Sequence, residues 1–123
     1  MSSTPPIIVA SEHRERLLQL AWSTESAVAE QLETELERAR VLPLSGVPED
    51  VIVMNSELEY EEAATHQRRR LQLVYPQDAN PAAGRVSILT PLGCALIGLR
   101  AGQEIEWRMP GGMRRLRVLS VGR

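Results

Sequence analysis

Apolar residues recur every three or four positions in the first third of the chain. One stripe begins near residue 11, and a second stripe of about 14–16 residues follows residue 26. The apolar positions of the second stripe are Ala27, Val28, Leu32, Leu36 and Ala39. Two amphipathic helices joined by a short polar link pack antiparallel. Residues 1–41 are therefore predicted to form an N-terminal helical hairpin, a short coiled coil.

The pattern changes after a stretch that holds two prolines and a glycine, residues 42–50, which we expect to be a linker. Beyond it, apolar and polar residues alternate in short runs separated by turn residues, which predicts strands of a half-buried antiparallel sheet. The alternating positions are Val51 and Val53; Leu58 and Tyr60; Leu71, Leu73 and Tyr75; Val86 and Ile88; Ile105, Trp107 and Met109; Leu116 and Val118. Residues 51–123 should form the second domain.

One short helix interrupts the predicted strands. Thr90 is placed to cap it, Pro91 to occupy its first position, and Gly98 to end it. The predicted fold class is α+β: a short antiparallel helical hairpin followed by an antiparallel β-sheet domain with one short helix.

Composition limits the class of protein. A chain of 123 residues with 43% hydrophobic residues can form one globular core. The lone Cys94 cannot form an internal disulfide, and no apolar run reaches the roughly 18 residues of a membrane span. We therefore expect a cytoplasmic protein with no membrane contact.

Charge is distributed unevenly although the net charge is only −2. Residues 1–50 hold nine acidic side chains against four arginines, whereas the basic residues of the second part include the clusters Arg68, Arg69, Arg70 and Arg114, Arg115, Arg117. These clusters are candidates for a basic contact surface toward phosphate or acidic protein. Strand alternation also explains Arg115 and Arg117 as the solvent face of a sheet. Because aromatic residues are only 3%, sequence-specific nucleic-acid recognition is not expected.

Candidate catalytic chemistry is sparse. His13, His66 and Cys94 stand apart, so neither a metal site nor a catalytic cysteine or serine arrangement is predicted. All basic residues are arginine, which excludes Schiff-base chemistry on lysine. The sequence predicts a protein that is not an enzyme, with no cofactor.

The turn between the two predicted helices carries Trp22, Ser23, Thr24 and Glu25. A carboxylate here can enter another protein's cleft, although Glu25 is also explained as an acid in the first turn of a helix. We expect Trp22 to fold back onto the rest of the chain, the alternative being an exposed aromatic.

The segment TPLGCALIGLRAGQEIEW, residues 90–107, followed by Pro110-Gly111-Gly112, closely resembles the C-terminal signature of the Gre transcript-cleavage factors. The segments Val53-Met54-Asn55-Ser56 and Leu73-Val74-Tyr75-Pro76, with the compact hairpin, are similar to the Rnk branch of that family. The resemblance implies that residues 51–123 form a Gre-type C-terminal domain folded like the FK506-binding prolyl isomerases (FKBP-like). It also implies a role on bacterial RNA polymerase.

Gre factors place an acidic pair at the tip of a long coiled coil, where it helps hold a metal ion in the polymerase secondary channel. Here the hairpin is short and its tip offers Glu25 alone, so the resemblance implies polymerase binding near the secondary channel, in competition with Gre factors, without transcript cleavage. Thr90 and Pro91 match two positions of the surface by which Gre factors dock, while Leu89 replaces an acid.

An alternative function follows from the role after which the Rnk branch is named: regulation of the level or activity of nucleoside diphosphate kinase, by direct contact or through expression. Prolyl isomerase activity is not expected, since the chain has no phenylalanine to line a proline pocket. A monomer is the expected state, because the helical stripes can be satisfied within the pair.

Overall fold

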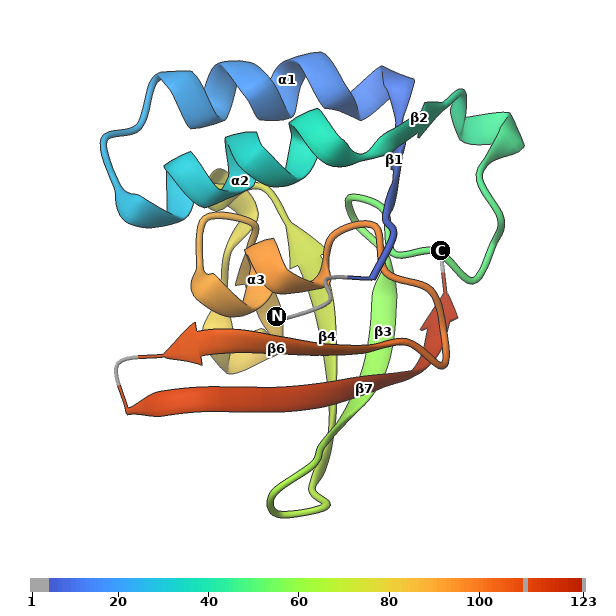
Figure 1. Cartoon of the computed structure of the whole chain (residues 1–123), viewed down its shortest axis with the longest axis vertical. Helices are drawn as coiled ribbons and strands as arrows, with labels where there is room; N and C mark the ends of the chain where they lie inside the picture. The colour runs from blue at the N-terminus through green and yellow to red at the C-terminus, as the bar shows by residue number, and fades with distance from the viewer. Residues whose placement is uncertain (1–4, 110, 123) are drawn as a thin grey trace.

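The computed structural model describes residues 5–109 and 111–122, with residues 107–109 described by their backbone. A helical hairpin lies across one side of the molecule, above a short helix and a twisted sheet (Figure 1). Among the described residues, no helix combines the length and the apolar character needed to cross a lipid bilayer.

The hairpin consists of α1 (Ser11–Trp22) and α2 (Ala27–Arg38). The strand β1 (Ile8–Ala10) leads directly into α1, and β2 (Arg40–Leu42) follows α2. These two short strands pair in parallel and join the ends of the two helices that lie away from the connecting turn. The second helix has 12 residues, shorter than predicted, because the chain becomes extended at Ala39 in order to form β2.

The sheet has five strands in the order β5-β4-β3-β7-β6. Their bounds are β3 (Glu57–Glu62), β4 (Arg68–Val74), β5 (Arg85–Ser87), β6 (Glu104–Met109) and β7 (Gly112–Gly122). Three of the neighbouring pairs are antiparallel, as predicted, but β5 pairs with β4 in parallel. The prediction of a wholly antiparallel sheet is wrong here, because the 3₁₀ turns Pro76–Asp78 and Pro81–Ala83 bring the chain back beside Gln72, from where β5 runs parallel to the last residues of β4.

Two other expectations about strands need qualification. Val51 and Val53 were predicted to lie on a strand, but Val51 forms only an isolated bridge with Arg100. The predicted turn at residues 110–112 joins β6 to β7, and Pro110 itself lies outside the described residues.

The short helix α3 (Pro91–Leu96) lies where the sequence predicts it, with Thr90 as its N-cap. It packs so closely on the end of β5 that a Cβ built on Gly93 lies 2.2 Å from the Ser87 carbonyl oxygen. After α3, Gly98 adopts a left-handed φ of +81° beside Ile7 and Ile8. Gly93 is required because a larger residue has no space there. Gly98 is required both by lack of space and by its left-handed backbone conformation.

One hydrophobic core connects the hairpin to the sheet. It contains side chains from α1, α2, α3 and the inner face of the sheet, among them Leu17, Leu32, Leu36, Leu73, Leu96 and Leu116. The α+β class, the helical hairpin and the short helix are therefore confirmed. The boundary at residues 42–50 stays a prediction, as does the FKBP-like character of the second part.

Candidate functional site

The turn of the hairpin, residues 22–26, is tied down at both ends by hydroxyl groups. Ser23 and Thr24 donate through their hydroxyls to the Leu20 carbonyl oxygen, at 3.1 and 2.9 Å, which completes the end of α1. Ser26 caps α2 by accepting a hydrogen bond of 3.0 Å from the Ala29 amide. These hydroxyls therefore have local structural roles, and Trp22 and Glu25 are the side chains that remain outward.

Trp22 does not fold back as expected: 62% of it is exposed. The side of α1 that faces the core carries Leu17, Leu18 and Ala21. Trp22 is the last residue of α1, one helical turn beyond the buried Leu18, and the polar turn begins directly after it. Glu25 is also exposed, so the tip presents one aromatic ring and one carboxylate to solvent.

Thr90 and Pro91, the predicted docking residues, are half-buried at the start of α3. The Thr90 hydroxyl donates to the Ser87 carbonyl oxygen at 2.8 Å and accepts from the Gly93 amide at 3.0 Å. It is thus engaged within the fold. Whether these residues dock a partner stays a prediction. Unlike the Thr90 hydroxyl, the half-buried ring of Pro91 takes no part in the cap of α3.

The structure divides the six arginines of the predicted basic surface between the two faces of the sheet. Strand alternation places Arg68, Arg70, Arg115 and Arg117 on the outer face, and Arg69 and Arg114 on the other face. On the outer face Arg68 pairs with Glu61 at 3.4 Å, Arg70 with Glu59 at 3.6 Å, and Arg115 with Glu106.

On the other face Arg114 pairs with Glu62, and Arg69 donates to the Gln67 side chain at 3.3 Å. Most of these arginines therefore meet a carboxylate on a neighbouring strand. The six arginines therefore do not lie on one face of the sheet, and contact of either cluster with another molecule stays a prediction.

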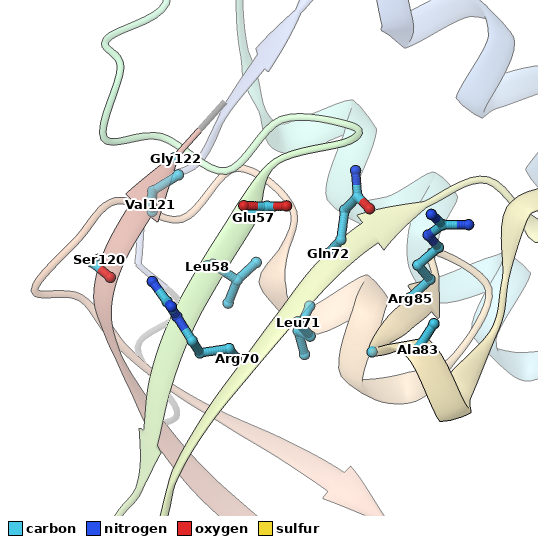
Figure 2. Close-up of a pocket in the computed structure, with 11 residues that line it drawn as sticks. Glu57, Leu58, Arg70, Leu71, Gln72, Ala83, Arg85, Ser120, Val121 and Gly122 are labelled. Carbon is cyan, nitrogen blue, oxygen red and sulfur yellow. The ribbon is translucent and has the colours of Figure 1, made fainter.

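A hollow of about 530 Å³ opens on the sheet between β3, β4, the end of β7 and the residues before β5 (Figure 2). Its lining includes the small residues Ala83, Gly84, Ser120 and Gly122. In Figure 2, Arg70 and Arg85 lie on opposite sides of the hollow, with Glu57 between them. The two guanidinium groups do not converge, so the hollow lacks the focused polar groups that orient a small ligand.

A smaller groove of about 310 Å³ lies between α1 and residues 75–77. The Arg16 guanidinium stacks over the Tyr75 ring there, 3.8 Å from the ring centroid. Sequence reasoning missed this contact, because the two residues belong to different segments and no local pattern links them. The stacking ties the exposed side of α1 to the segment that directly follows β4.

The groups that the sequence offers for metal or thiol chemistry are His13, His66 and Cys94. Within the described part of the chain, no group of three or more His, Cys, Asp or Glu residues could hold a metal ion. Burial raises the pKa of the Cys94 thiol to about 12, so this side chain remains a neutral thiol at physiological pH.

Two family models match the chain. "Rnk N-terminus" matches residues 5–42, and "Transcription elongation factor, GreA/GreB, C-term" matches residues 47–123. In Escherichia coli K12, the "Regulator of nucleoside diphosphate kinase" is 34% identical over 114 residues, which cover 90% of this chain and 84% of the relative.

Two further relatives carry the name of an elongation factor. The transcription elongation factor GreA of Syntrophus aciditrophicus is 34% identical over 92 residues, which cover 75% of this chain and 57% of GreA. The solved structure of a prokaryotic transcription elongation factor GreA/GreB from Nitrosomonas europaea is 38% identical, with a TM-score of 0.81 over 97% of this chain and 99% of that one. The compact hairpin and the sheet described above therefore occur together in a solved relative.

Proposed function

The chain belongs to the GreA/GreB transcription elongation factor family and, within it, to the Rnk branch, and from that premise we propose that it binds bacterial RNA polymerase. It docks near the secondary channel, competes with Gre factors and does not cleave transcripts. Its relatives support a Gre-like regulator associated with transcription, and to this the proposal adds the partner and the mode of action.

The proposal that the chain does not cleave transcripts depends on the carboxylates at the tip of the hairpin. A catalytic divalent cation takes several oxygen ligands, and a Gre-type mechanism supplies two of them from an acidic pair. Here Glu25 is the single carboxylate of residues 22–26.

The length and the packing of the hairpin support the same conclusion. Each helix has 12 residues, or about 18 Å of length, and packs through Leu17, Leu32 and Leu36 onto the chain's own core. A hairpin held in this way covers a surface and does not reach deep into a channel.

The start of α3 is the proposed docking point of the C-terminal part. Pro91 and Leu92 are half-buried and offer apolar surface beside the Thr90 cap. Leu89 stands where the resemblance expects an acid, so this contact depends more on apolar surface than on an ion pair. We propose that the protein docks there as a monomer.

A second candidate function is the regulation of nucleoside diphosphate kinase, in level or activity. It is favoured by the name of the Escherichia coli relative, which aligns with 90% of this chain. Direct contact with the kinase and an effect through its transcription both fit that name, and the second route is compatible with polymerase binding.

The test is equilibrium binding of the purified chain to bacterial core RNA polymerase, with and without an excess of GreA, and in parallel to nucleoside diphosphate kinase. We expect binding to polymerase that GreA displaces, and no binding to the kinase. Absence of polymerase binding at micromolar concentrations contradicts the first proposal, and binding to the kinase alone favours direct kinase regulation.

A further inference from the structure

Trp22 is the most exposed large hydrophobic residue among those whose side chains the structure describes, at 62%, ahead of Met113 and Val41. Tryptophan buries a large area when it is covered, and it is enriched among the residues that dominate protein interfaces. Trp22 ends α1 and borders a polar turn. Its exposure makes it a candidate anchor for a partner.

The backbone that carries Trp22 is rigidly held. The Ser23 amide donates to the Gln19 carbonyl oxygen at 3.0 Å, and the Ser23 and Thr24 hydroxyls both bond to the Leu20 carbonyl. One turn before Trp22, Leu18 is buried in the core. A side chain on such a platform loses little backbone entropy on binding, which is the condition for a strong anchor.

The charge beside the ring indicates the chemistry of the partner. Glu25 is exposed next to the tip, and Glu30, Glu33 and Glu37 follow along one side of α2. Among the described residues, Glu35 is the one glutamate of α2 that forms an ion pair, with Arg38. The other carboxylates are left to complement positive charge on another molecule.

We propose that Trp22 anchors the hairpin to RNA polymerase by inserting into an apolar cleft bordered by lysine or arginine side chains. This inference rests on the proposed function and adds the contact residue and the chemistry of the surface it meets. Trp22 supplies the apolar contact, and Glu25 with the glutamates of α2 supplies the charge complementarity. Ser23, Thr24 and Ser26 hold the turn and need not touch the partner.

The experiment measures the affinity of the full-length chain for purified core polymerase in four variants. Trp22→Ala should bind about 30-fold more weakly than wild type, as expected for a central aromatic anchor. Trp22→Phe should lose less, because it keeps an aromatic ring. Glu25→Gln should weaken the salt dependence of binding. The control is Val41→Ala, an exposed hydrophobic position on β2, at the opposite end of the hairpin from its turn (Figure 1).

A photo-crosslinking amino acid at position 22, compared with one at position 41, identifies the surface that is touched. We expect crosslinks from position 22 to a polymerase segment rich in lysine or arginine. If wild type binds but Trp22→Ala binds equally well, the anchor is wrong while the proposed function stands. If wild type does not bind polymerase, both fail, and crosslinks from position 22 to a second copy of this chain also overturn the proposal.

Discussion

The segment around α3 and the turn of the hairpin differ in what determines their residues. Around α3, Thr90 caps the helix, Gly93 lies against backbone, and Gly98 takes a left-handed conformation beside β1. In the turn, the hydroxyls also complete or cap helices, but Trp22 and Glu25 are exposed to solvent. The segment that most resembles Gre factors is thus explained largely by the needs of the fold.

This difference separates two kinds of information. The resemblance at residues 90–107 indicates how the C-terminal part folds, since Thr90, Gly93 and Gly98 each meet a packing or backbone requirement. The turn of the hairpin, with Glu25 as its single carboxylate, is where the proposed function departs from that of a cleavage factor. Its function is therefore to be sought in the side chains that packing leaves outward.

The largest effect tests whether the hairpin belongs to the common core. Leu36 lies on the buried side of α2 and is fully buried in the core that the hairpin shares with the sheet. Leu36→Ala should therefore lower the free energy of unfolding by about 3.5 kcal/mol. The measurement is denaturant unfolding followed by circular dichroism, with the exposed neighbour Glu37→Ala as control. A hairpin that unfolds separately, leaving the main transition unchanged, would contradict a shared core.

The close approach of α3 to β5 gives the next effect. Gly93→Ala places a Cβ against the Ser87 carbonyl oxygen, at a site where backbone must move, and should destabilise the fold by about 3 kcal/mol. Gly111→Ala is the matched control, because nothing lies within 4 Å of a Cβ at that position. Equal unfolding midpoints for the two variants would show that α3 is not constrained as described.

A smaller effect concerns the capping of the turn. Ser26→Ala removes the acceptor for the Ala29 amide and should destabilise α2 by about 1 kcal/mol. Thr34→Ala, which removes an exposed hydroxyl that bonds within the same helix, serves as control. Equal unfolding midpoints for Ser26→Ala and Thr34→Ala would contradict a cap that stabilises α2.

The smallest effect lies at the other end of the hairpin and depends on pH. The hydrogen bond from the Leu44 amide, at 2.8 Å, is the main cause that lowers the pKa of Glu12 below its usual value of 4.5. A carboxyl with a lowered pKa stabilises the fold above its unfolded pKa, and this contribution is lost as pH falls through the folded pKa. Unfolding measured between neutral pH and about pH 3 should therefore show a shallower acid loss in Glu12→Gln than in wild type. Identical pH profiles would contradict this linkage.

Much of the architecture follows from local pattern. The helical stripes predict the hairpin, and Thr90, Pro91 and Gly98 predict α3, because capping and periodicity act over a few residues. Alternation correctly places Arg115 and Arg117 outside and Leu116 and Val118 inside.

The errors arise where distant segments decide the outcome. The parallel pairing of β5 depends on how residues 75–84 return across the sheet, and the pairing of β1 with β2 depends on both ends of the hairpin. The exposure of Trp22 depends on where the core beneath α1 ends. Segments far from Trp22 in the sequence form that core, so the residues around Trp22 do not predict it. The pairing of Arg114 with Glu62 likewise needs the register of two strands.

The most direct test of the proposed role is an RNA cleavage assay on a stalled, backtracked elongation complex, with the chain alone and with the chain added to GreA. We predict that the chain alone leaves the transcript at full length, and that increasing amounts of it slow the cleavage that GreA stimulates. Shortened transcripts in the presence of the chain alone would contradict a non-cleaving competitor, as would GreA cleavage that stays equally fast at saturating chain.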